Sequence, residues 1–120
     1  MPDTPAAANR LENRYARYHA HVYFDAASVA QARALCAAAG ERFGVRVGRV
    51  HEKRVGPHPC WSCQLAFDSH QFDALVAWLD AHRGGLDVLL HGDTGDDLAD
   101  HTAHVGWLGR SHVLDLSAFR

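Results

Sequence analysis

The sequence has little of what marks secreted, membrane-spanning and nucleic-acid-binding proteins. It has only three cysteines, an odd number that offers no disulfide framework and favours a reducing, cytoplasmic location. The formal net charge is −2, without a block of like charges, so neither nucleic acid nor an anionic membrane is an expected partner. Residues 1–10 lack the basic and apolar stretches of a signal peptide, and no apolar run reaches the length of a membrane span.

Length and composition predict one domain with a modest core. The 120 residues are 48% hydrophobic and 22% charged, which is ordinary for a globular protein. We expect residues 1–14 to form a flexible N-terminal tail and residues 15–120 to form a single domain.

Apolar spacing predicts an α+β domain with the element order βαββαβ. Residues 18–24 alternate, so that His19, His21 and Tyr23 share one face opposite an apolar one. The order is that of the ferredoxin-like fold, an antiparallel sheet with helices on one face. The predicted strands are residues 18–24, 45–51, 61–67 and 86–91, and the helices follow the first and third of them, after Asp25 or Ser28 and after Asp68-Ser69.

The segment after the fourth predicted strand is acidic and has weaker signals. Thr94 is a candidate N-cap for a short helix over residues 95–103. Trp107 lies where the chain returns to the domain and is a candidate to line a pocket for an aromatic substrate. Residues 113–116 are predicted to form a short terminal strand.

The sequence is rich in histidine, with ten such residues. His19 and His21 lie at the start of the first strand, His58 lies between two prolines before the third, and His91 ends the fourth. We expect the first strand to pair antiparallel with the fourth and parallel with the third, which brings these four histidines to one edge of the sheet. Because neutral imidazole is the commonest metal ligand, the sequence predicts a mononuclear metal site there.

Imidazole ligands alone do not choose among iron(II), manganese and zinc. Non-haem iron oxygenases often add a carboxylate, and Glu52 and Asp93 are the nearby candidates, although both are more simply interpreted as surface loop residues. His101 and His104 are spaced by three on the short helix and are weaker candidates beside the site. The other histidines are expected at the surface: His51, His70, His82 and His112.

The segment Cys60-Trp-Ser-Cys63 matches the C-x-x-C pattern of redox proteins. A redox pair begins a helix, whereas a strand here would point Cys60 and Cys63 to opposite faces. We therefore expect structural cysteines. Cys36 lies on an apolar helix face and is expected in the core.

Three motifs occur in order: Tyr18-His-Ala-His-Val-Tyr-Phe24, Gly56-Pro-His-Pro59, and His91-Gly-Asp-Thr-Gly-Asp-Asp-Leu-Ala-Asp-His-Thr102 followed by Trp107-Leu-Gly109. With them the chain resembles the DOPA 4,5-dioxygenase family of small fungal and bacterial proteins. The resemblance implies a ferredoxin-like fold and extradiol cleavage of a catechol such as DOPA with O2 at iron(II), with zinc or manganese as the other candidate metals. Gly92 departs from the proline expected there, which would loosen that turn and leave the ligand in place.

The resemblance transfers the histidines of the three motifs to this chain. We expect His21, His58 and His91 to bind the metal, and His19 to serve as an acid–base group or fourth ligand. His104 joins His19 as a candidate catalytic residue.

Other functions stay open at this point. A non-catalytic metal-binding or ligand-binding module would bind metal without consuming oxygen, and a metal-dependent isomerase or hydrolase would act without oxygen. A redox C-x-x-C protein is a more distant alternative. An open sheet face would also leave apolar surface that a symmetric homodimer could cover.

Overall fold

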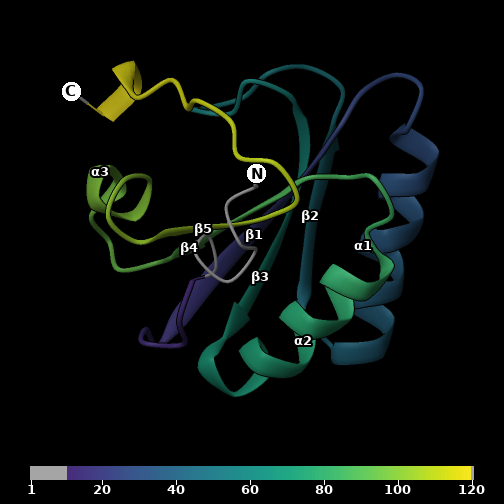
Figure 1. The fold of residues 1–120 in the computed structure, drawn as a ribbon, viewed down its shortest axis with the longest axis horizontal. Coiled ribbons are helices and arrows are strands. Elements are labelled where there is room, and N and C mark those ends of the chain that lie inside the picture. The colour runs from purple at the N-terminus through teal and green to yellow at the C-terminus, as the bar shows by residue number, and fades with distance from the viewer. Residues whose placement is uncertain (1–10, 120) are drawn as a thin grey trace, which may run out of the picture.

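The computed structural model describes residues 11–119 and shows a five-stranded antiparallel sheet with the strand order β2-β3-β1-β4-β5. Helices α1 and α2 lie together on one side of it, and α3 and the C-terminal segment lie on the other (Figure 1). The predicted ferredoxin-like βαββαβ order is confirmed. In chain order the elements are β1 (Arg17–Phe24), α1 (Val29–Phe43), β2 (Arg46–His51), β3 (Trp61–Asp68), α2 (Ser69–His82), β4 (Val88–Gly92), α3 (Asp97–Asp100), β5 (Val105–Leu108) and the 3-10 turn η2 (Ser117–Phe119).

Helix α1 begins and ends where local sequence signals place it. The Asp25 carboxylate accepts hydrogen bonds from the backbone N–H of Ala27 and Ser28 and from the Ser28 hydroxyl, which closes a turn directly before the helix. Gly44 ends α1 with a φ of +69°, a left-handed conformation that costs glycine little. The buried face of α1 consists of Ala32, Leu35, Cys36 and Ala39.

Helix α2 starts with a capping box. The Asp68 side chain accepts from the backbone N–H of His70 and Gln71, and the Gln71 side chain accepts from the Asp68 N–H, so that free backbone donors are satisfied in both directions. One stripe of the helix is buried against the sheet, because apolar residues recur every three or four positions. The stripe consists of Phe72, Leu75, Val76 and Leu79.

Part of the predicted N-terminal tail contacts the domain. The Asn13 side chain donates to the Ser69 carbonyl oxygen and accepts from the Tyr18 hydroxyl, at 2.9 and 2.8 Å. The rest of that predicted tail, residues 1–10, lies outside the described residues. Within residues 11–119, no helix has the length and apolar character that crossing a membrane requires.

The expected parallel pairing of the first and third strands is wrong. β1 pairs antiparallel with β3, in a register that sets Phe24 opposite Trp61. The crossover through α1 makes β2 run in the same direction as β1, and β3 returns from β2 between them, so β3 opposes both. The segment that carries His58 therefore enters β3 at the end of β1, not at its start.

Two expectations after β4 are also wrong: the terminal strand over residues 113–116 and the Thr94 cap of the short helix. Residues 105–108 form a fifth strand that pairs antiparallel with β4, whereas residues 113–116 form no strand and the Val113 side chain is 90% exposed. The short helix α3 is capped by Asp96, whose side chain accepts from the Ala99 N–H. Thr94 instead donates its N–H and its hydroxyl to the Asp100 carboxylate.

The two faces of the sheet are packed differently. The main core fills the space between the sheet and the two long helices and includes Cys63 and Cys36. A smaller cluster on the opposite face consists of Tyr23, Leu89 and Trp107, with Cys60 packed against it. Cys60 and Cys63 thus lie on opposite faces, as the strand pattern predicts, and all three cysteines are free thiols.

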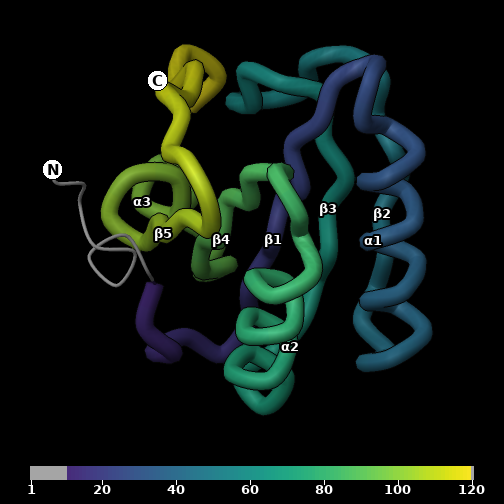
Figure 2. Tube along the Cα trace, turned by 45° about the vertical axis from the view of Figure 1, so that its right-hand side comes forward, coloured from purple at the N-terminus to yellow at the C-terminus, as the bar shows by residue number. Residues whose placement is uncertain are grey.

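The face of the sheet opposite α1 and α2 is called the helix-free face, because neither long helix covers it. It is partly covered by α3 and the C-terminal segment (Figure 1). Figure 2 shows the C-terminal segment and α3 on the β4–β5 side of the sheet, away from α1. The Asp115 N–H donates to the Pro57 carbonyl oxygen at 2.9 Å, and Leu114 packs on the small cluster. These segments form a cover over the side chains that point away from the helices.

Candidate metal site

Strand register aligns the central residues of the site. His19 of β1 lies directly opposite His91 of β4, and Ala66 of β3 lies opposite His19 on its other side. Arg46 of β2 pairs with Ala66. Because directly paired residues share a face, these four residues form one row across the helix-free face, and His21 follows two positions further along β1.

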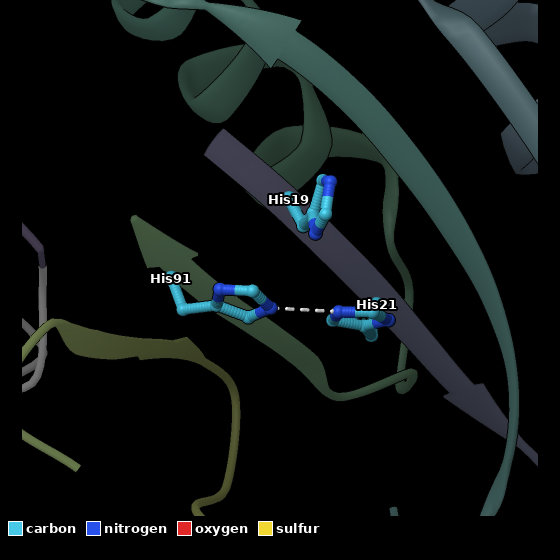
Figure 3. A group of neighbouring side chains, drawn as sticks. All are labelled: His19, His21 and His91. Atoms are coloured by element: carbon cyan, nitrogen blue, oxygen red, sulfur yellow. Dashed lines mark hydrogen bonds between the residues drawn. The ribbon is translucent and has the colours of Figure 1, made fainter. Parts of the chain in front are cut away.

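His19 and His91 of this row converge with His21, which lies in the next row along β1. One ring nitrogen from each of His19, His21 and His91 lies within 4.8 Å of the other two. The Nε2 atoms of His21 and His91 are 2.9 Å apart (Figure 3). His21 and His91 are 5% and 3% exposed, so their rings meet in a space largely closed to water.

A backbone contact fixes the protonation of His91. Its Nδ1 lies 2.8 Å from the Gly92 carbonyl oxygen, which accepts only, so Nδ1 carries a hydrogen and donates. In the neutral ring Nε2 then holds a lone pair that faces His21, and the His21 Nε2–H donates to it. A second ring nitrogen held in this way is the common means of orienting a metal-binding imidazole.

His58 reaches the same place by a different path from the one expected. It is 6% exposed, and its ring centroid lies 4.1 Å from that of His21. Its Nδ1 is 2.8 Å from the Tyr23 hydroxyl oxygen. The loop between β2 and β3 folds over the helix-free face, which brings His58 to the cluster although β3 begins at the far end of β1.

The structure separates His101 from His104. The His101 ring lies 4.3 Å from the His91 ring and 6.4 Å from the His58 ring, and it stacks on Phe119 at 4.8 Å. The His104 ring packs on Tyr15 instead, with its Nδ1 2.7 Å from the Tyr15 hydroxyl oxygen. His101 thus lines the cluster, and the catalytic role given to His104 stays a prediction without a contact to the cluster in its support.

Of the two candidate carboxylates, Asp93 lies beside the histidines and Glu52 does not. Asp93 Oδ2 lies 3.6 Å from His19 Nε2. Glu52 is exposed and pairs with Arg33 at 3.9 Å. Asp100 is 2% exposed and accepts from Thr94, and its charge raises the pKa values of His19 and His91 slightly against larger opposing effects. Asp93 therefore remains the carboxylate beside the histidines.

Burial keeps the clustered imidazoles neutral. Desolvation is the largest cause that lowers the pKa values of His21, His58 and His91, and the values for His58 and His91 fall to about 4. Desolvation also lowers the pKa of His19, although the Asp93 carboxylate partly opposes it. Neutral imidazole is the form that binds metal ions, so burial favours metal binding at pH 7. His21 would bind an ion through Nε2 as its other neutral tautomer, with the hydrogen on Nδ1.

An open cavity of about 330 Å³ lies beside His19. Arg17 and Arg46 contribute positive charge to its lining, Asp68 and Asp93 contribute negative charge, and Gln71 adds an amide. Trp107 takes no part in it: that side chain is 9% exposed and packs against Tyr23 and His112. The cavity gives a small polar molecule access to the exposed edge of the histidine cluster.

The residues present fit a metal ion. The Nε2 atoms of His21 and His91 are separated by 2.9 Å, which is close enough for both to contact one ion at metal–nitrogen distances of about 2.0–2.1 Å. His19 adds a third imidazole at the more exposed edge. The donor set that the geometry favours is therefore His19, His21 and His91, with His58 beside it.

Some features of the site could not be read from the strand pattern. Alternation along β1 predicts that Tyr23 faces the site. Its hydrogen-bond partner His58 lies in a loop, and the strand pattern does not predict the path of that loop. His101, at the end of α3, also reaches the cluster. The signals for it in the sequence are its spacing from His104 and its place in the third motif. His112, expected at the surface, is bonded to the buried Asp87 carboxylate at 2.8 Å.

The chain resembles known proteins over most of its length. A sequence profile of the Dopa 4,5-dioxygenase family matches residues 18–118. The chain is 28% identical over 116 residues to the DOPA 4,5-dioxygenase of Amanita muscaria, covering 89% of this chain and 51% of that protein. It is 36% identical over 81 residues to an uncharacterized 21.2 kDa protein of Botryotinia fuckeliana, covering 61% of this chain and 44% of that protein. It thus spans about half the length of the curated relatives it matches.

A solved structure agrees with the same relationship. The crystal structure of a candidate dioxygenase from Nostoc punctiforme is 44% identical to this chain and superimposes with a TM-score of 0.73, covering 85% of this chain and 89% of that one. The resemblance inferred from the three motifs is confirmed by the family match. The chain belongs to the Dopa 4,5-dioxygenase family.

Proposed function

We propose that this chain cleaves the ring of a catechol with molecular oxygen, in the extradiol mode, at a metal ion bound by His19, His21 and His91. The observation that carries the proposal is the convergence of three neutral imidazoles at one point, in a chain of the Dopa 4,5-dioxygenase family. The reaction adds both atoms of O2 across the ring bond next to the diol and yields a muconic semialdehyde.

Iron(II) is the metal that suits this reaction best. A site of imidazoles with open positions accommodates iron(II), manganese or zinc, and oxygen chemistry favours the redox-active ions. When bound, the metal would act as a Lewis acid for the catechol oxygens and as a template that holds both reactants. The protein's part is to supply neutral ligands, exclude water and position a proton acceptor.

We assign the proton acceptor to His58 and the third ligand position to His19, which exchanges the roles inferred from the motifs. His58 lies beside His21, and the Tyr23 hydroxyl holds its ring in place. Burial lowers the pKa of His58 to about 4, so the ring is neutral at pH 7. A neutral imidazole keeps one unprotonated nitrogen, which can accept a proton from the catechol. It can return that proton to the product, as general acid–base catalysis requires.

The cavity beside His19 supports a substrate that carries both an anionic and a cationic group, because its lining holds two arginines and two aspartates. Arg17 and Arg46 line it together with Asp93. A guanidinium binds a carboxylate through two parallel hydrogen bonds. A catechol amino acid such as DOPA would place its ring toward the histidines and its carboxylate toward these arginines.

The test is an oxygen-uptake experiment with purified protein loaded with iron(II) without oxygen. L-DOPA or a simple catechol is added, oxygen is admitted, and oxygen consumption and the yellow ring-opened product are followed together. The proposal expects matched uptake and product, both lost in His21→Ala and retained in His70→Ala, whose exposed side chain lies on α2. Bound metal without uptake across a catechol panel would favour a non-catalytic binding module, and turnover without oxygen would favour an isomerase or hydrolase.

Two further expectations stay predictions. The homodimer was inferred from an open apolar sheet face, and that face is partly covered by Leu114 and the loop that carries Cys60. The cytoplasmic location rests on the cysteine content of the sequence. Sedimentation of the metal-loaded protein tests the first of these directly.

A further inference from the structure

A second group of reactive side chains lies outside the histidine cluster. Cys60 precedes β3, Asp87 precedes β4, and His112 follows β5. The His112 Nε2 lies 2.8 Å from Asp87 Oδ2, and the His112 Nδ1 lies 3.8 Å from the Cys60 sulfur. One imidazole therefore bridges a carboxylate and a thiol that are 27 residues apart in the chain.

The hydrogen bonds fix the direction of proton transfer in this group. Asp87 is a carboxylate and can only accept, so the His112 Nε2–H donates to it. The neutral ring then presents its Nδ1 lone pair to the Cys60 thiol. A nucleophile within reach of a base, with the base oriented by a third group, is the arrangement that activates serine and cysteine nucleophiles.

The carboxylate is itself held rigidly. Asp87 is 8% exposed, and its Oδ1 accepts from the Arg110 backbone N–H at 2.8 Å. Gly109 has a φ of +84°, and the carboxylate fills the space that a side chain at Gly109 would need. A rigid Asp87 holds the His112 ring in one orientation.

The thiol opens into a cavity. Cys60, Asp87 and His112 line a space of about 200 Å³, together with Ser28 and Arg110. The Arg110 side chain is 88% exposed, and its Nε lies 3.7 Å from Asp87 Oδ2. By contrast, Cys36 and Cys63 are 1% and 0% exposed, so Cys60 is the cysteine that a reagent can reach.

Tyr23 separates this group from the histidine cluster. Its hydroxyl contacts His58, while its ring lies 5.2 Å from the His112 ring. The Tyr23 side chain therefore lines both the histidine cluster and the Cys60 group, and the reactive side chains of the two sites are different.

The resting thiol is protonated. Desolvation, followed by the negative charge of Asp87, raises the pKa of Cys60. A reaction of Cys60 at neutral pH therefore requires a base that removes the proton as the new bond forms.

We propose that Cys60, His112 and Asp87 form a second reactive site that adds the Cys60 thiol to a small α,β-unsaturated carbonyl compound. The S–H bond breaks and its proton passes to His112 Nδ1, while sulfur forms a bond to the β-carbon. The electron pair of the C=C bond moves toward the carbonyl group, and the α-carbon then takes the proton back from His112. Nothing is oxidised or reduced and no group leaves, so these three residues suffice for the whole reaction.

The inference is independent of the proposed function, and its test uses a different readout. Acrylamide, a neutral α,β-unsaturated amide, is the probe, and the alkylation rate of each cysteine is followed by mass spectrometry of peptides. We expect Cys60 to react while Cys36 and Cys63 do not. In His112→Gly the Cys60 rate should fall about 10- to 100-fold and recover when free imidazole is added.

The control is His82→Gly, which removes a histidine whose ring bonds to a backbone carbonyl oxygen on α2, and it should leave the Cys60 rate unchanged. The two buried cysteines report folding, because labelling of Cys36 or Cys63 would reveal a loosened variant. In that case His112→Asn, which keeps a polar side chain, provides the comparison. An unchanged Cys60 rate in a folded His112 variant, or no recovery with imidazole, would overturn the proposal.

Discussion

The two faces of the sheet differ in what their side chains do. The face under α1 and α2 is sealed with apolar groups, of which Ala20, Val22 and Leu65 are 0% exposed. The opposite face is also largely buried, but it is lined by titratable groups such as His21 and His91. Alternation along β1 sends successive residues to one face or the other, so a single strand contributes to both.

The side chains on the first face mainly stabilise the fold, whereas those on the opposite face provide the chemical groups of the site. Apolar burial on the helix side provides most of the folding free energy. On the helix-free side, every described buried polar side-chain atom has a hydrogen-bond partner, and several of these bonds join titratable groups, such as His21 to His91 and Tyr23 to His58. Substitutions on the first face should therefore change stability, and substitutions on the second should change metal binding and turnover.

The largest effect is expected from His91→Ala. It removes the ring whose Nε2 faces His21 and whose Nδ1 is fixed by the Gly92 carbonyl oxygen. We expect no measurable turnover and loss of stoichiometric iron, while the metal-free variant stays folded and loses about 1–3 kcal/mol in free energy of unfolding because the buried His21 Nε2–H loses its acceptor. Oxygen uptake and metal analysis check this, and normal turnover would remove His91 from the site.

The opposite result is expected from Leu75→Ala on the other face. Leu75 is 0% exposed within the main core, and such a truncation costs about 2–5 kcal/mol because it leaves a cavity. Urea unfolding should show this loss, while the folded variant keeps its iron stoichiometry. A Leu75→Ala protein of normal stability that had lost iron would break the distinction between the two faces.

Acid should destabilise the metal-free protein through the helix-free face. The pKa values of His58 and His91 are lowered to about 4, against about 6.5 in the unfolded chain, so the unfolded state binds more protons between these values. The contribution is fully present above pH 6.5 and is lost as pH falls toward 4, by on the order of 2 kcal/mol for each histidine at pH 5. Urea unfolding at pH 7.5 and 5.0 measures it, and equal stability at both values would argue against neutral, buried rings.

A smaller effect is expected from Tyr23→Phe, which removes the hydroxyl beside His58 Nδ1 and keeps the aromatic packing. If His58 moves a proton, the variant should bind iron normally and lose about tenfold in kcat, since one hydrogen bond to an oriented base is worth roughly 1.4 kcal/mol. Steady-state kinetics beside iron titration separate the two. Weakened iron binding with unchanged kcat would instead make His58 a ligand.

The smallest effect is expected from Asp93→Asn. Asp93 lies 3.6 Å from His19 and is partly exposed, and a charged group in such a setting contributes less than about 1 kcal/mol to its neighbour. Iron affinity should change by less than about fivefold. Complete loss of iron would show that Asp93 is itself a ligand and that the three-histidine assignment is incomplete.

The helix side of the fold was largely predictable from sequence, because its signals are local. Gly44 and the Asp68–Gln71 box fix the helix ends, and apolar spacing fixes the buried stripes. The alternation of β1 also placed His19 and His21 on the functional face. These features depend on neighbours within a few residues.

The helix-free side was less predictable, because its contacts join distant segments. His58 reaches His21 only because the loop before β3 folds over the sheet, not through the parallel pairing that was expected. His101 and His112 depend on the paths of α3 and the C-terminal segment, where periodicity is weak. Histidine count and motif order indicated that a site exists, but not which rings would share it.

The most direct test of the metal assignment is anomalous diffraction at the iron edge from crystals of the iron(II)-loaded protein grown without oxygen. The account predicts one peak in contact with a ring nitrogen of each of His19, His21 and His91, with His58 bonded to Tyr23 and not to the ion. A peak ligated by His58 in place of His19, or iron bound away from this cluster, would contradict it.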